Sequence, residues 1–270
     1  MGGPNSVSPS RGPQTGYNAP ASQLAIHLGC EAANITLAGG PAAGLEVFAA
    51  AADALREERA KIAVAGAVES ISYYGLTALE SAGWTSDGAE PPRPFDLRRS
   101  RPAPGEAGVA IVLEHPRHAR GRTLARLVAS ATCSDATRAE STLRAALDQA
   151  GLRPADVSAV VASASGHRET DALEAGLLAS VFGEGTPVAA IKGAVGECLG
   201  ASPALQCAVA VQAMTEGLLP GTTGFAERDP GLPRLAVSAD PVRGPFDRIA
   251  VTALDPEEGF ALAILERGAY

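Results

Sequence analysis

Short apolar runs alternate with amphipathic stretches along most of the chain. The runs at 33–38 (ANITLA), 61–69 (KIAVAGAVE) and 109–114 (VAIVLE) have the length and composition of buried strands. Between the first two, an alanine-rich stretch predicts a helix from Pro41 to about Arg59. The order strand, helix, strand predicts a β-α-β unit in the first half of the chain.

The second half repeats this alternation over a longer stretch. The pattern predicts strands at 123–132, 157–164, 187–191, 234–238, 247–254 and 259–266, and helices at 137–151, 168–182 and 202–216. Such alternation is typical of a parallel or mixed sheet that is covered on both faces. The second half is therefore predicted to form a complete βαβαβαββ unit. The first half has the pattern of the same unit without its first two strand and helix pairs.

Two predicted helices are apolar nearly all round. The helix at 202–216 is expected to begin with Ser202 as N-cap and Pro203 as its first residue, and the helix at 41–55 is equally rich in alanine. A helix without a polar face fits between two sheets. Packed back to back, these helices predict a five-layered α-β-α-β-α body. The proline-rich stretch 86–106 predicts a long surface loop.

Composition excludes several classes of protein. The chain has 270 residues, 46% of them hydrophobic, and a formal charge of -8, which argues against nucleic acid or an anionic membrane as partner. Its four cysteines are widely spaced without a C-x-x-C pair, so we expect no metal site and no disulfide framework. The first 20 residues lack the basic and apolar regions of a leader, and no segment reaches the ~20 apolar residues that span a bilayer. We expect a cytoplasmic protein without a cofactor.

Four motifs occur in a definite order along the chain. They are NIT followed by a glycine turn and a helix, RPFD at 93–96 followed by GEAGVAIVLE at 105–114, AGLRPADVSAVVASASG at 150–166, and IKGAVGECLGAS at 191–202. Together they resemble the β-ketoacyl synthases, condensing enzymes of the thiolase fold. The resemblance implies αβαβα layers, with a truncated N-terminal half at 1–122 and a complete C-terminal half at 123–270.

The resemblance implies a catalytic cysteine at a helix start and two histidines, and none of the three is present. Pro41 stands at the cysteine position, Ser163 at the first histidine and Glu197 at the second, whereas Lys192 is retained. Pro256 stands where the family has an oxyanion-hole donor, and proline has no N–H to donate. We therefore expect no catalysis by this chain alone.

Two alternatives remain open for these residues. Glu197 is either a surface-loop acid or a cavity-facing acid that pairs with Lys192. An enzyme of altered chemistry, an acyl-thioester decarboxylase or an acyltransferase, would use Glu197, Ser163 or Lys192. The stretch 163–169 contains Ser, His and Glu, but triads are assembled from separate segments and no G-x-S-x-G turn is present.

Inactive relatives of the ketosynthases include the chain-length factors of type II polyketide synthases, some of them in polyene-making systems. Residues 7–29 are similar to the stretch that precedes the active-site strand in those factors. The resemblance implies a heterodimer with an active ketosynthase and contact with an acyl carrier protein through that complex. It also implies that Ile35, in the strand at 33–38, lies at the dimer contact and that Tyr17 lies near the acyl-chain tunnel.

The order of strands in each half bears on assembly. The resemblance implies the order 3-2-1-4-5 in each half, which places the two absent strands between the third strand and the rest. Their absence would leave unpaired backbone groups that must be covered. We therefore expect an obligate heterodimer.

Overall fold

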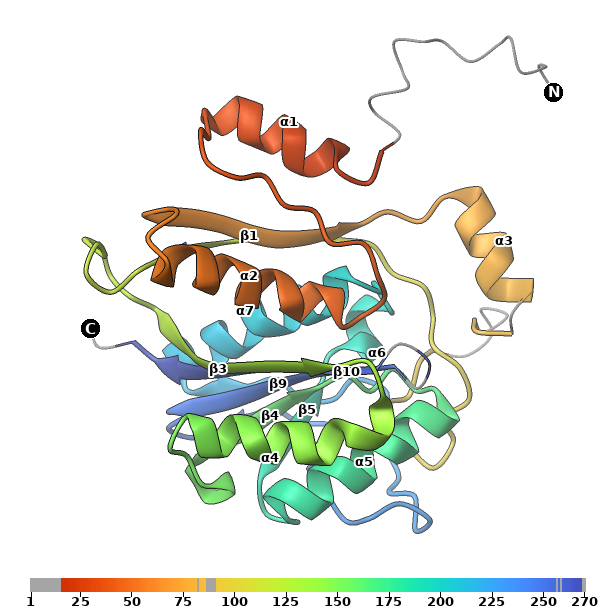
Figure 1. Ribbon diagram of the computed structural model, residues 1–270. Helices are drawn as coiled ribbons and strands as arrows, with labels where there is room; N and C mark the ends of the chain where they lie inside the picture. Colours follow the sequence, from red (N-terminus) through yellow and green to blue (C-terminus); the bar gives the residue numbers. More distant parts are fainter. Residues whose placement is uncertain (1–15, 82, 86–90, 256, 258, 269–270) are drawn as a thin grey trace, which may run out of the picture.

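The larger sheet of the protein is formed by the second half of the chain (Figure 1). The computed structural model describes residues 16–81, 83–85, 91–255, 257 and 259–268. Its six-stranded sheet has the order β3 (Ala125–Cys133), β10 (Gly259–Arg267), β9 (Arg248–Asp255), β4 (Ala159–Ala162), β5 (Pro187–Ala190) and β7 (Ala236–Val237). The strand β10 is antiparallel to both neighbours, and the remaining pairs are parallel. The predicted mixed sheet is confirmed.

Helices α4 (Ala139–Gln149) and α5 (Arg168–Phe182) cover one face of this sheet (Figure 1). Leu143, Leu147 and Leu178 on these helices are fully buried in one hydrophobic core with Leu262 and Ile264 of β10. The helix predicted at 168–182 is confirmed at both ends. The helix predicted at 137–151 begins as a 3₁₀ turn, Ala136–Arg138, before the regular α4.

The opposite face of the sheet packs on α7 (Ala201–Glu216), and α2 (Ala43–Arg56) lies beside α7. A Cβ at Gly44 would clash with the carbonyl oxygen of Gly200, so the absence of a side chain there allows the two helices to approach closely. A second core joins these helices to β1 (Ile62–Glu69) and β2 (Ala107–Glu114), which pair antiparallel. The expected pair of helices between two sheets is confirmed.

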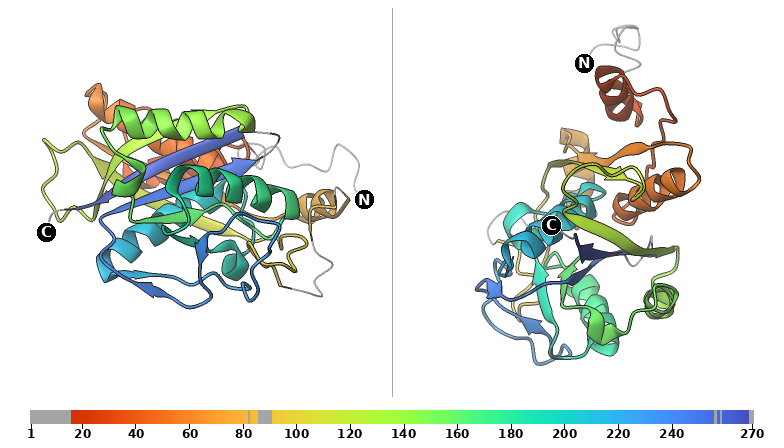
Figure 2. Two further views of the ribbon diagram at one scale, coloured as in Figure 1. Left: turned by 90° about the horizontal axis from the view of Figure 1, so that it is seen from below. Right: turned by 90° about the vertical axis from the view of Figure 1, so that its left-hand side faces the viewer.

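Two elements lie toward the edges of the molecule. Figure 2 shows α1 (Ala19–Leu28) outside the body, above the β1–β2 sheet, and no residue of α1 is buried. The loop helix α3 (Tyr73–Ser81) also has no buried residue. The short strands β6 (Leu218–Leu219) and β8 (Val242–Arg243) form a separate antiparallel pair, and α6 (Lys192–Val195) follows β5. No helix in the described ranges is long and apolar enough to cross a bilayer.

The expected strand at 33–38 is wrong for this chain as described. Its residues are exposed, with Ile35 49% accessible, and they pair with no other described strand. A strand is defined by hydrogen bonds to a neighbour, and the local apolar pattern does not supply that neighbour. The helix expected from Pro41 to about Arg59 is shorter in the structure. The regular helix begins at Ala43 and ends at Arg56.

The assumed strand order is wrong as well. When the five long strands of the second half are numbered along the chain, β3, β4, β5, β9 and β10, the order across the sheet is 3-2-4-5-1. If the first half follows the same order, one strand position lies between 33–38 and β1, and the other lies beyond β2. The boundary between halves at 122 and 123 stays a prediction, because α7 contacts strands of both halves.

Candidate functional site

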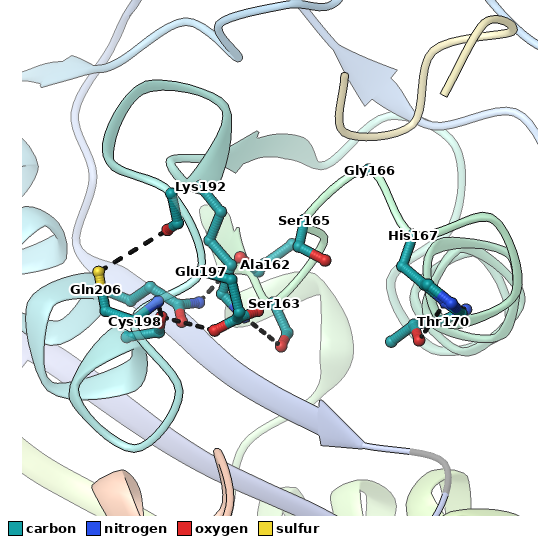
Figure 3. A network of polar contacts seen from close by, with 12 residues as sticks. Ala162, Ser163, Ser165, Gly166, His167, Thr170, Lys192, Glu197, Cys198 and Gln206 are labelled. Carbon is teal, nitrogen blue, oxygen red and sulfur yellow. Dashed lines mark hydrogen bonds and ion pairs between the residues drawn. The ribbon is translucent and has the colours of Figure 1, made fainter. Parts of the chain in front are cut away.

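The candidate site lies where β4 and β5 end at the same edge of the parallel part of the sheet. Ser163 directly follows β4, Lys192 begins α6 just after β5, and Glu197 lies in the turn that leads to α7. Adjacent parallel strands bring their carboxyl ends together, which is where open α/β sheets commonly hold functional groups. Figure 3 shows these three side chains pointing toward one another.

A buried ion pair is the centre of this cluster. Lys192 Nζ lies 2.6 Å from Glu197 Oε2, and both side chains are almost completely buried. Lys192 Nζ also donates a hydrogen bond of 3.3 Å to Ser163 Oγ. The expectation that Glu197 faces the interior and pairs with Lys192 is confirmed, and the surface-loop alternative is wrong.

The second carboxylate oxygen of Glu197 is held by α7. Ser202 Oγ donates a hydrogen bond of 2.9 Å to Glu197 Oε1 and accepts one of 2.9 Å from the backbone N–H of Cys198. The prediction of Ser202 as N-cap is wrong, because Gly200 occupies that position and Ser202 lies in the first turn. The turn includes Leu199 at φ 43°, a left-handed conformation that is uncommon for leucine. Ser202 thus joins the turn to the ion pair.

The backbone of Glu197 is anchored to a distant segment. Its N–H donates to the carbonyl oxygen of Ala103 at 2.7 Å, and its own carbonyl oxygen accepts from the N–H of Gly105 at 2.9 Å. These bonds tie the backbone of Glu197 to the PAPGE stretch at 102–106 and thereby fix where its side chain begins. Hydrogen bonds on both its carboxylate and its backbone leave Glu197 little freedom to move.

Two further buried carboxyl groups lie on α5. Asp171 accepts backbone N–H groups of Phe95, Ser165 and Gly166 at 2.8 to 3.2 Å. Glu174 Oε1 accepts a hydrogen bond of 2.8 Å from the backbone N–H of Ser163. Burial raises the pKa of Asp171 to about 6 and the pKa of Glu174 to about 7, against the lowering effect of their hydrogen bonds. Asp171 ties the RPFD loop to the site, and Glu174 supports the backbone of Ser163.

Two polar residues near the site were missed from the sequence. Thr252 Oγ1 donates to Glu174 Oε1 at 2.6 Å, and Gln206 Nε2 contacts three carbonyl oxygens, those of Val161, Ala162 and Thr252. Both side chains are fully buried. The sequence does carry a signal for both residues, because each is a polar residue in an otherwise apolar part of its strand or helix. A polar residue in such a place is usually satisfied by a specific partner.

The structure places the remaining predicted residues as follows. Pro41 is buried in the turn before α2, where its carbonyl oxygen accepts the N–H of Gly44. A Cβ on Gly200 would lie 3.7 Å from the carbonyl oxygen of Gly39, so this turn adjoins the start of α7. Tyr17, in contrast, is 86% exposed and directly precedes Asn18, the N-cap of α1. Pro256 lies outside the described residues.

The arrangement presents no paired nucleophile and base. Lys192 donates to Ser163 and to Glu197, whereas activating Ser163 would require a group that accepts its proton. Burial and the charge of Glu197 raise the pKa of Cys198, which disfavours its thiolate. His167 caps α5 by bonding to Thr170 and stacks on Trp84 with ring centroids 5.8 Å apart. Among the described residues, no group of three or more His, Cys, Asp or Glu side chains could hold a metal ion.

The two halves of the chain match the two domains of one protein family. Residues 1–119 match the family described as Beta-ketoacyl synthase, N-terminal domain, and residues 125–226 match Beta-ketoacyl synthase, C-terminal domain. Similar proteins include the Tetracenomycin polyketide synthase ketoacyl synthase beta subunit of Streptomyces glaucescens, 32% identical over 246 residues that make up 85% of this chain. The corresponding alpha subunit is 29% identical over 77% of the chain. The chain spans 60% and 54% of the lengths of these two relatives.

Solved structures share the fold over nearly the whole chain. A type II polyketide synthase acyl-carrier protein in complex with its ketosynthase bound to the hexaketide has a TM-score of 0.91, at 20% identity, covering 98% of this chain and 70% of that one. The ishigamide ketosynthase/chain length factor has a TM-score of 0.89, at 23% identity, over 98% of this chain and 68% of that one. The predicted thiolase fold is therefore confirmed.

Proposed function

Because the chain belongs to the β-ketoacyl synthase family, we propose that it is a non-catalytic subunit that pairs with an active ketosynthase in type II polyketide biosynthesis. In this role it acts like a chain-length factor: it shapes the tunnel around the growing acyl chain and meets the acyl carrier protein through the complex. The tetracenomycin beta subunit and the ishigamide ketosynthase/chain length factor, both similar to this chain, support the proposal.

The observation that carries the proposal is the buried Lys192–Glu197 ion pair. In a condensing enzyme this region would hold the second histidine, a group that works on a thioester. Here a carboxylate occupies the position, and its negative charge opposes both a thiolate nucleophile and a developing oxyanion. Pro41, in the turn before α2, has no reactive side chain and no N–H. Each of these changes removes a separate requirement of the condensation reaction.

The segment 33–38 supports the proposed partner. It is extended, exposed and rich in β-branched residues, and its backbone groups are not paired within the described chain. An unpaired apolar edge of this kind is an aggregation hazard unless another strand covers it. A strand from a ketosynthase would complete it by edge-to-edge pairing, with Ile35 in the contact.

Co-expression with a tagged ketosynthase tests the proposal. We expect the wild-type chain to co-purify and to show no condensation of malonyl thioester by itself. Ile35→Lys should abolish co-purification, whereas Leu173→Lys should not, since Leu173 is similarly exposed (53%) but lies on α5. Condensation by the isolated chain, or full affinity of the Ile35→Lys protein, would contradict the proposal. Turnover of malonyl or acyl thioesters by a monomeric chain would favour the alternative decarboxylase or acyltransferase.

A further inference from the structure

A cavity of about 360 Å³ lies on the α4 side of the larger sheet, at the end opposite to the Lys192–Glu197 pair. Its lining comes from β3, β9 and β10 and from the residues that follow α4. Arg248 in this lining begins β9, whereas Ser163 follows the carboxyl end of β4, and these two strands are parallel. The cavity is therefore separate from the candidate site, and its volume lies within the range of small-molecule sites, about 300–1,000 Å³.

Two arginines share one carboxylate in the wall of this cavity. Glu266 of β10 is paired in register with Arg126 of β3 on one side and with Arg248 of β9 on the other. Arg126 Nη1 donates a hydrogen bond of 3.0 Å to Glu266 Oε2, and Arg248 Nε and Nη2 donate bonds of 2.9 and 2.6 Å to Oε1. Because each guanidinium group bonds to one oxygen of the same carboxylate, the two groups lie close together. These bonds do not use Arg126 Nη2 or Arg248 Nη1, which remain as donors.

The charged groups around the cavity carry one positive charge in excess. A second acid near Arg248 is Asp156, whose carboxylate accepts two hydrogen bonds from the side chain of Arg153. Hydrogen bonds from Arg153, and to a smaller extent the charge of Arg248, lower the pKa of Asp156 to about 2, so this acid is ionised at neutral pH. Three guanidinium groups thus accompany two carboxylates, on a chain whose formal charge is -8. An anion with a single charge would balance this excess.

The rest of the cavity wall is formed by apolar side chains, those of Leu127, Val128, Ala150 and Leu152. A β-bulge shapes the strand side of this wall. Leu127 and Ala129 oppose consecutive residues of β10, which leaves Val128 without a partner on that strand. On the helix side, α4 ends at Gln149, and Gly151 turns the chain with φ 68°. An apolar wall and a pair of arginines therefore border the same space.

We propose that this cavity binds a monocarboxylate with a short apolar body. The carboxylate of the ligand would bridge Arg126 and Arg248, as the carboxylate of Glu266 does, and its apolar part would lie against Val128 and Leu152. Guanidinium groups match the planar two-oxygen geometry of a carboxylate. A phosphate monoester, which carries about -1.5 to -2 charges at neutral pH, would exceed the local excess of one positive charge. This site is additional to the proposed role in polyketide biosynthesis.

Octanoate is the probe that tests this proposal, in calorimetric titration and hydrogen exchange of the 270-residue chain. We expect one octanoate per chain and slower exchange of the backbone amides at 126–128 and 150–152. Arg126→Gln should weaken binding at least tenfold, because it removes one of the two bridging guanidinium groups. The matched control is Arg144→Gln, which removes an exposed, ion-paired arginine of α4 and should leave binding unchanged. Octan-1-ol lacks the charge and acetate lacks the apolar body, so each should bind at least tenfold more weakly than octanoate.

Four results would overturn this inference. They are the absence of saturable octanoate binding, undiminished binding by the Arg126→Gln protein, equal affinity for octan-1-ol or acetate, and protection confined to other segments of the chain. The side chain of Arg126 is 60% exposed, so the variant should fold, and circular dichroism verifies that it does. The exchange experiment on the wild-type chain locates the site without any substitution. No ketosynthase is present in these measurements, so their outcome is independent of the proposed heterodimer.

Discussion

Removing the carboxylate of Glu197 should strongly destabilise the protein. Glu197→Ala leaves the ammonium group of Lys192 buried without its partner, and breaking a buried ion pair in this way costs about 3–5 kcal/mol. The hydroxyl of Ser202 also loses its acceptor, which adds about 1 kcal/mol. For a chain of this size, at about 2–4 °C per kcal/mol, the midpoint of thermal unfolding should fall by about 8 °C or more.

Urea unfolding of Glu197→Ala measures this effect directly, and a double-mutant cycle of Lys192→Met and Glu197→Leu tests whether it arises from the ion pair. Lys192→Met with Glu197→Leu replaces the pair by apolar side chains of similar volume, so the double variant should lose less stability than either single variant. The matched control is Asp53→Ala, which breaks the exposed Arg56–Asp53 pair and should change the free energy of unfolding by less than about 1 kcal/mol. The reasoning would be refuted if Glu197→Ala lowered the free energy of unfolding by less than about 1 kcal/mol and the effects of Lys192→Met and Glu197→Leu were additive.

Three further predictions follow from other parts of the fold. Gly44→Ala should destabilise by about 1–3 kcal/mol because its Cβ meets the carbonyl oxygen of Gly200, whereas Gly176→Ala, in open space on α5, should stabilise by about 0.5–1 kcal/mol in the same denaturant assay. Burial raises the pKa of Glu174 from 4.5 to about 7, so its contribution to stability is present below about pH 4.5 and is lost as the pH rises through 7. Glu174→Gln should therefore gain stability relative to wild type over this range, and a pH-independent difference would contradict the assignment. Tyr17→Ala, co-expressed with the partner ketosynthase, should change the distribution of product chain lengths, and an unchanged distribution from an intact complex would exclude Tyr17 as a wall of the tunnel.

Much of the second half could be predicted from the sequence because its signals are local. Hydrophobic periodicity placed α5 correctly at both ends and the strands β9 and β10 to within one residue. Motif order identified the family, and the same motifs singled out Ser163, Lys192 and Glu197, which the structure brings into one hydrogen-bonded cluster. These conclusions depend on side-chain pattern and spacing, which the chain carries along its length.

Only the tertiary structure decided what depends on distant partners. The stretch 33–38 has the composition of a strand, yet a strand requires backbone hydrogen bonds to a neighbour, and none pairs with it among the described residues. Ser202 has the sequence context of an N-cap, but the nearby carboxylate of Glu197 gives its hydroxyl a different role. The raised pKa of Glu174 likewise arises from burial beneath residues far away in the chain. Local propensity determined which elements form, whereas pairing and desolvation, which depend on long-range contacts, determined how they are used.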